Sequence, residues 1–163
     1  MKRAYVTMLC GGDGYVPGVE ALGRSLLASG TREAKIVMVT ADVSAAARGA
    51  LAEQGWMLRD IEALSRPSPD APALLPRFDN VFSKLRAWQL TDVEKVVLLD
   101  ADTLVLRNVD DLFERPELAA APDFLMPDRF NSGVMVLEPS ARTLQRMLDF
   151  SSDAENYDGG DQG

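Results

Sequence analysis

Two aspartates stand at the end of an aliphatic stretch. Residues 96–106 read VVLLDADTLVL, which places Asp100 and Asp102 directly after four apolar residues. A run this apolar predicts a strand buried on both faces of a parallel sheet, with both carboxylates at its carboxyl end. Two neighbouring anions repel each other unless a cation or a proton intervenes. A hard cation such as Mn²⁺ or Mg²⁺ would relieve that repulsion and could also bind diphosphate oxygens.

The spacing of this pair does not discriminate between functions by itself. The chain has 16 aspartates, so an Asp-x-Asp pair is expected by chance about once or twice, and a plain aspartate turn at a strand end is the structural alternative. The stretch also resembles the haloacid-dehalogenase phosphohydrolases, in which a strand ends in D-x-D-x-T and the first Asp is the nucleophile. That family needs a later lysine, whereas all four lysines here precede Asp100.

Composition excludes several other classes of function. The formal net charge of -8 disfavours nucleic-acid binding, although a divalent cation can bridge an acidic protein to a phosphate-bearing ligand. The absence of histidine removes Ser-His-Asp and Cys-His catalysis and every histidine-based metal site. Cys10 is the single cysteine, which fits a reducing compartment, so we expect a cytoplasmic protein. No apolar run approaches the roughly 18 residues of a membrane-spanning helix.

A glycine-rich loop follows the first predicted strand. Residues 11–15 read GGDGY, and such a loop at the carboxyl end of a strand could cradle a phosphate. The dinucleotide fingerprint is incomplete, because Pro17 stands where the third glycine belongs, and the lysine of a P-loop is missing. A flexible turn is therefore the alternative reading, and Tyr15 is a candidate for stacking on a base.

Alternating strands and helices organise the chain as one α/β domain over residues 1–163, without internal repeats. Residues 65–80 hold four of the nine prolines and predict a long irregular loop. Trp56 and Trp88 are expected in the core. The patterns predict strands at 2–9, 35–40, 56–61, 94–100 and 131–139, and helices at 19–29, 44–55, 81–90, 109–115 and 140–152.

Five stretches taken together resemble the glycogenin-like branch of glycosyltransferase family 8, which includes glycogenin, galactinol synthase and plant glycogenin-like glucuronosyltransferases. They occur in the family's order and span essentially the whole chain: AYVTMLCGGDGYVPGVEALGRSL, FSKLRAWQL, VVLLDADTLVLRNVDDLF, FNSGVMVLEPS and YDGGDQG. The resemblance implies a GT-A (Rossmann-like) fold and a retaining hexosyl transfer from a UDP-sugar, with Mn²⁺ or Mg²⁺ as cofactor. The acceptor would be a hydroxyl of a carbohydrate, a polyol or a protein.

The resemblance also assigns roles to individual residues. Asp100, Ala101 and Asp102 match the Asp-x-Asp stretch, whose two aspartates bind the metal and the nucleotide. The remaining matches are Met8, Leu9 and Tyr15 around the uridine, Arg77 and Lys84 as donor contacts, Asn131 and Ser132 beside the transferred sugar, Asp158 on the sugar hydroxyls, and Asp161 and Gln162 at the reaction centre.

The sequence departs from that family at its end. Relatives continue from D-G-G-D-Q-G into a helix and an H-x-x-G-x-x-K segment, whose histidine completes the metal site and whose glycine and lysine hold the diphosphate. This sequence ends at Gly163. We therefore expect a chain that lacks this segment, binds UDP-sugar weakly and turns it over poorly or not at all. Exposed apolar surface would favour self-association into a homo-oligomer. A non-catalytic nucleotide-binding module is the alternative.

Overall fold

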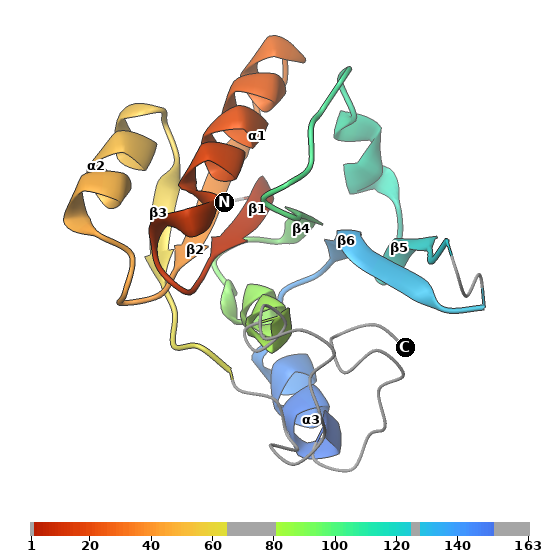
Figure 1. The fold of residues 1–163 in the computed structure, drawn as a ribbon. Helices are drawn as coiled ribbons and strands as arrows, with labels where there is room; N and C mark the ends of the chain where they lie inside the picture. Colours follow the sequence, from red (N-terminus) through yellow and green to blue (C-terminus); the bar gives the residue numbers. More distant parts are fainter. Residues whose placement is uncertain (1, 65–80, 125–127, 152–163) are drawn as a thin grey trace.

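The computed structural model describes residues 2–64, 81–124 and 128–151, and these form a six-stranded sheet with helices on both faces (Figure 1). The strands are Arg3–Leu9 (β1), Ala34–Val39 (β2), Met57–Asp60 (β3), Lys95–Leu99 (β4), Ala119–Pro122 (β5) and Phe130–Leu137 (β6). The α-helices are Val16–Ala28 (α1), Ala45–Glu53 (α2) and Ala141–Ser151 (α3). Short 3₁₀ helices span Asp13–Tyr15 (η1), Val81–Gln89 (η3) and Asp110–Glu114 (η4).

The sheet is mostly parallel, in the order β3-β2-β1-β4-β6-β5. Strand β1 pairs in parallel with β2 and β4, and β2 pairs in parallel with β3. Strands β6 and β5 complete the sheet in antiparallel fashion. The predicted α/β architecture, a mostly parallel sheet flanked by helices, is confirmed.

Aliphatic residues on both faces of the central strands create two core layers, as expected for parallel strands covered by helices. Along β1, Tyr5 and Leu9 face the layer under α1 and α2, whereas Ala4 and Val6 face the layer under η3 and α3. Trp56 belongs to the first layer and Trp88 to the second, and both are buried, as predicted.

Local signals in the sequence account for the helix ends. The Ser44 Oγ accepts a hydrogen bond from the Ala47 N–H at 3.1 Å and caps α2. Gly30 follows α1 with a positive φ of 79°, a conformation that glycine adopts without strain. Helix α1 begins at Val16, three residues earlier than predicted, because Pro17 in its first turn is compatible with a helix start.

Two features differ from or extend the predictions. Residues 81–89 form a 3₁₀ helix, which has three residues per turn. Strand β5 was not predicted, because its sequence AAAP has low strand propensity. The proline-rich loop predicted at 65–80 lies outside the described residues. None of the helices in the described ranges is long and apolar enough to cross a membrane.

Candidate functional site

The sequence-predicted site residues gather at one edge of the sheet. The chain runs from β1 outward to β3 and then returns to β4 on the other side of β1, so connections diverge between β1 and β4. Ligands of open α/β sheets bind at such a switch point, outside the carboxyl ends of the strands. Met8 and Leu9 end β1, and Asp100 directly follows β4. Because β6 is antiparallel to β4, its first residues reach the same edge.

A cluster of three side chains occupies this edge. The Lys84 Nζ lies 2.9 Å from Asp100 Oδ1 and 3.1 Å from Asp100 Oδ2, and it donates to the Ser132 Oγ at 2.8 Å. Lys84 and Ser132 are buried, whereas the Asp100 side chain keeps 33% of its surface exposed. The ammonium group therefore holds the carboxylate from the protein side and leaves it open to a ligand from outside.

The 3₁₀ geometry of η3 explains why a lysine is buried here. With three residues per turn, Lys84 and Ala87 lie on one face of η3, and both are buried. The aliphatic part of Lys84 thus packs with apolar neighbours while its ammonium group reaches the polar edge of the sheet. Lys84 is therefore a buried residue and not part of a solvated helix face.

Asn131 and Asp100 approach each other over a glycine. The Asn131 Oδ1 accepts from the Gly133 N–H at 2.8 Å, and the Asp100 N–H donates to the Gly133 carbonyl at 3.0 Å. A Cβ at Gly133 would lie 2.9 Å from the Asn131 Oδ1 and 3.4 Å from Asp100 Oδ2. Because Gly133 has no side chain, the side chains of Asn131 and Asp100 can both point into the space beside it.

The two aspartates have different surroundings. Asp102 is exposed, and Asp100 is tied to Lys84. The turn between them is closed by Thr103, whose N–H and Oγ1 both bond the Asp100 carbonyl, at 3.1 and 2.7 Å. Ala101 is half-buried. A Cβ built on Gly18 of α1 would lie only 2.4 Å from the Ala101 carbonyl oxygen.

The side chains at this edge provide some, but not all, of the ligands that a hard divalent cation needs. Asp100 and Asp102 offer carboxylate oxygens with solvent access, the ligand type that Mn²⁺ and Mg²⁺ prefer. Among residues 2–64, 81–124 and 128–151, however, no group of three or more His, Cys, Asp or Glu side chains could hold a metal ion. Two carboxylates would thus bind the cation, and water or ligand oxygens would complete its shell.

The glycine-rich loop turns away from β1 through two left-handed residues. Gly11 and Gly12 have φ values of 78° and 84°, which only glycine adopts readily. Asp13 then accepts from the Ser44 N–H at 2.9 Å, and hydrogen bonds from Ser44 lower the pKa of Asp13. This contact joins the loop to the start of α2. Tyr15 follows with 52% of its surface exposed, so its ring is not part of the core.

The last two residues of β1 face different core layers: Leu9 faces the layer under α1 and α2, and Met8 faces the layer under η3 and α3. The Leu9 side chain is fully buried in the layer under α1 and α2, so only its backbone is available to a ligand. Met8 is half-buried on the opposite face, as is Cys10. Burial raises the pKa of the Cys10 thiol to about 11, against the lowering effect of the Thr40 and Ser83 hydroxyls. The thiol is therefore protonated at neutral pH.

Four predicted site residues, Arg77, Asp158, Asp161 and Gln162, lie outside the described ranges. Sequence reasoning missed Gly18 and Gly133, which stand against the Asp-x-Asp turn and beside Asp100. Gly18 stands just before the helix predicted at 19–29, so no local pattern marked it as a site of close packing.

Relatives of the chain are glycosyltransferases. The chain matches none of the models that describe known protein families. It is 42% identical over 163 residues to glycogenin-1 of Oryctolagus cuniculus, 41% over 165 residues to glycogenin-1 of Caenorhabditis elegans, and 38% over 162 residues to UDP-glucuronate:xylan alpha-glucuronosyltransferase 1 of Arabidopsis thaliana. The alignments cover 99%, 100% and 99% of this chain but only 49%, 38% and 24% of the relatives. The chain thus spans less than half the length of these proteins.

Solved structures with the same fold are also glycosyltransferases. Galactosyltransferase LgtC, solved with donor and acceptor sugar analogs, superimposes with a TM-score of 0.71 at 19% identity, over 98% of this chain and 68% of that chain. Glycosyltransferase GlyE of Streptococcus pneumoniae gives a TM-score of 0.65 at 23% identity, over 98% of this chain and 42% of that one. At these identities the likeness concerns the fold, which is the GT-A fold.

Proposed function

Because the chain belongs to the glycogenin-like branch of glycosyltransferase family 8, we propose that it is the donor-binding part of a retaining transferase that uses a UDP-sugar. The observation that carries this proposal is the cluster of Lys84, Asp100 and Ser132. Three segments far apart in the sequence converge there, at the carboxyl end of a buried strand. The partly exposed carboxylate of Asp100 is open to a ligand at that edge.

In this proposal the protein residues bind and orient the donor. Asp100 and Asp102 hold a divalent cation, Mn²⁺ or Mg²⁺, and that ion when bound neutralises charge on the departing UDP. Lys84 fixes the direction of the Asp100 carboxylate, and Ser132 fixes Lys84. Asn131 faces the same space as Asp100 and contacts the transferred sugar.

The remaining assignments complete the donor site. Tyr15 stacks on uracil beside Met8 and the backbone of Leu9. Arg77 and Asp158 contribute to donor binding, and Asp161 and Gln162 face the reaction centre. We assign no covalent nucleophile: the one thiol, Cys10, is held protonated by burial. The acceptor is a hydroxyl of a carbohydrate, a polyol or a protein.

Calorimetry with UDP, with and without Mn²⁺, tests the binding step. We expect Mn²⁺ to raise the affinity for UDP, and Asp102→Asn to abolish that increase without lowering stability, since Asp102 is exposed. Asp111→Asn is a matched control, because Asp111 is also an exposed aspartate on the segment after β4. Equal affinity for UDP with and without Mn²⁺ in the unmodified chain would contradict the proposal.

A second candidate function is nucleotide binding without turnover. It is favoured by the metal site, since the described residues provide two carboxylates and no group of three or more metal-binding side chains. Hydrolysis of UDP-glucose, UDP-galactose and UDP-glucuronate at saturating Mn²⁺ separates the two. Turnover supports the transferase, and binding without turnover supports the module. The cytoplasmic location and the homo-oligomer stay predictions.

A further inference from the structure

The segment that carries the aspartates runs along α1 and contacts it twice. After β4, residues 100–109 pass beside this helix (Figure 1). At the start of α1, Gly18 lies against the backbone of Ala101. Seven residues further along α1, the buried Ser25 accepts from the Val105 N–H at 3.0 Å. Residues seven apart lie on the same face of a helix, so one face of α1 receives both contacts.

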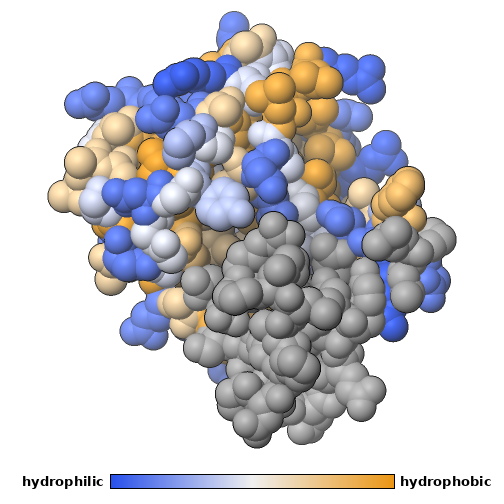
Figure 2. Space-filling view, in the orientation of Figure 1, coloured by the Kyte–Doolittle hydropathy of each residue, from blue (hydrophilic) through white to orange (hydrophobic). Residues whose placement is uncertain are grey.

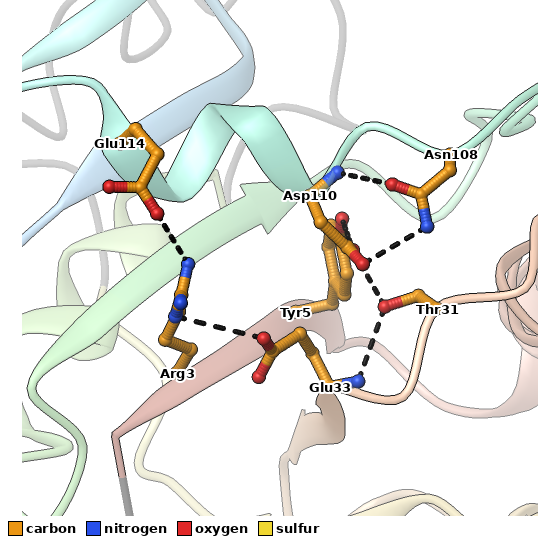
Figure 3. Close-up of polar contacts among 7 residues, drawn as sticks. All are labelled: Arg3, Tyr5, Thr31, Glu33, Asn108, Asp110 and Glu114. Atoms are coloured by element: carbon orange, nitrogen blue, oxygen red, sulfur yellow. Dashed lines mark hydrogen bonds and ion pairs between the residues drawn. The ribbon is translucent and has the colours of Figure 1, made fainter.

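The segment is also held at its far end, by a cluster around Asp110 (Figure 3). The Asp110 carboxylate accepts from the Tyr5 hydroxyl at 2.7 Å, from the Thr31 hydroxyl at 2.6 Å and from the Asn108 amide at 3.0 Å. Thr31 lies three residues after the end of α1. Positions 18, 25 and 31 thus meet positions 101, 105 and 110 in order, and the segment follows α1 along its length.

The first contact depends on the absence of a side chain. A Cβ at Gly18 would lie 2.4 Å from the Ala101 carbonyl oxygen and 3.3 Å from its carbon. Both are backbone atoms, so alanine at this position requires the backbone of the turn or of the helix to move. Glycine inside a helix normally costs about 0.5–1 kcal/mol relative to alanine. Close packing against the turn is a physical reason for its presence.

Few residues separate the two contacts. Residues 101 and 102 lie in the turn that the Thr103 N–H closes, and only Thr103 and Leu104 separate that turn from Val105. We therefore expect a displacement at either contact to reach the turn that holds Asp100 and Asp102.

We propose that Gly18 and Ser25 are positioning residues, which set the place of the Asp-x-Asp turn from one face of α1. The inference depends on the proposed function in one respect: it assumes that this turn is the cation site. Neither residue touches the ligand in this proposal. Both act through the backbone of residues 101–105.

Gly18→Ala and Ser25→Ala test this, each with a matched control. Gly49→Ala adds a methyl group in α2 where nothing lies within 4 Å. Ser29→Ala removes a hydroxyl that, like that of Ser25, bonds a carbonyl within α1. We expect Gly18→Ala to lower the Mn²⁺-dependent affinity for UDP by at least about tenfold, since misplacement by about 1 Å has large effects. Ser25→Ala acts in the same direction, and the controls leave the affinity unchanged.

Hydrogen exchange provides the second measurement, which does not require ligand. The Thr103 N–H donates to the Asp100 carbonyl at 3.1 Å, so its protection reports the turn directly. Faster exchange in Gly18→Ala, with an unchanged melting temperature, supports positioning. Unchanged exchange and unchanged UDP affinity would overturn it, as would an equal loss in Gly49→Ala. If the unmodified chain does not bind UDP at all, the proposed function fails, and exchange at Thr103 still decides the role of Gly18.

Discussion

Asp100 and Asp102 belong to one motif but differ in what they do for the folded chain. Asp100 compensates the charge of Lys84, whose side chain is only 10% exposed, whereas Asp102 is exposed. Leaving a buried charge without its partner is costly, and the cost falls as the partner becomes more exposed. Substitution of Asp100 should therefore lower stability, whereas substitution of Asp102 should affect only cation binding.

We predict that Asp100→Asn lowers the free energy of unfolding by about 1–3 kcal/mol, the cost of a poorly compensated buried group, and that Asp102→Asn leaves it unchanged. Adding Lys84→Met to Asp100→Asn should restore part of the loss, because the buried charge is then removed. Urea unfolding of the four proteins gives the measurement. Equal stabilities of the two Asp→Asn variants would contradict the structural difference.

Cys10 offers a probe of the proposed base pocket. Because burial raises the pKa of its thiol to about 11, alkylation of the folded chain should be slow at pH 8 and should accelerate toward pH 11. In urea the rate should follow an ordinary thiol, with a pKa of about 8.5. Iodoacetamide labelling followed by mass spectrometry measures both. A fast reaction at pH 7 in the folded state would show that the thiol is not protected as the structure indicates.

At the scale of elements, the cluster around Asp110 joins β1, the loop between α1 and β2, and η4. Arg3 adds ion pairs to Glu114 at 2.7 Å and Glu33 at 3.7 Å beside it (Figure 3). Burial opposes ionisation of Asp110, but hydrogen bonds from Thr31, Tyr5 and Asn108 outweigh it and lower the pKa of that carboxyl. Burial and the nearby Asp110 raise the pKa of Tyr5. The hydroxyl therefore stays a donor.

The lowered pKa of Asp110 implies acid sensitivity. Its stabilising effect is present above the pKa of an unfolded aspartate, about 3.9, and is lost as the pH falls through the lower folded value. We predict that Asp110→Asn is less stable than the unmodified chain at pH 7 and that the difference narrows below about pH 4. Urea unfolding at a series of pH values tests this. A constant difference from pH 7 to pH 2 would exclude Asp110 as the titrating group.

Tyr5→Phe removes one donor to Asp110 while keeping the ring against Phe113, with the ring centroids 4.9 Å apart. A hydrogen bond to a charged group contributes about 1.5–3 kcal/mol, and we predict a loss of this size at pH 7. Thermal or urea unfolding measures it. A loss below about 0.5 kcal/mol would mean that Thr31 and Asn108 satisfy the carboxylate by themselves.

Elements with a strong local pattern could be predicted from the sequence, and pairings between distant segments could not. Aliphatic runs identified β1, β2 and β4, and Ser44 and Gly30 identified helix ends. The sequence AAAP of β5 carries no such signal, and periodicity did not separate a 3₁₀ helix from an α-helix over residues 81–89. The contact of Lys84 with Ser132 spans 48 positions and depends on β6 pairing with β4, which no local pattern encodes.

At the scale of the whole molecule, apolar side chains are exposed at the end of α1 and on the segment after the Asp-x-Asp turn. Leu27 is 58%, Leu104 61% and Leu106 86% exposed. In Figure 2 an orange area lies at the upper right, where Figure 1 draws the end of α1 and the segment after β4. Exposed apolar surface of this kind favours association between protein molecules.

We predict that Leu106→Ser lowers any concentration-dependent association without changing the melting temperature, because this side chain makes little contact with the rest of the chain. Light scattering over a range of protein concentrations measures association. Leu118→Ser is the control, since Leu118 is 48% exposed at another place, before β5. An equal effect of both substitutions would indicate general hydrophobic association rather than a specific surface.

The two tryptophans lie in different core layers, so each layer carries its own fluorophore. Trp56 stands under α1 and α2, with the Lys35 ammonium 5.4 Å from its ring. Trp88 stands under η3 and α3, and its Nε1 donates to Glu117 at 2.9 Å. Because Lys84 lies four residues before Trp88 on η3, emission from Trp88 in Trp56→Phe reports the layer that holds the candidate site. Unfolding curves from the two single-tryptophan proteins would coincide if the layers melt together, and would separate if the site layer opens first.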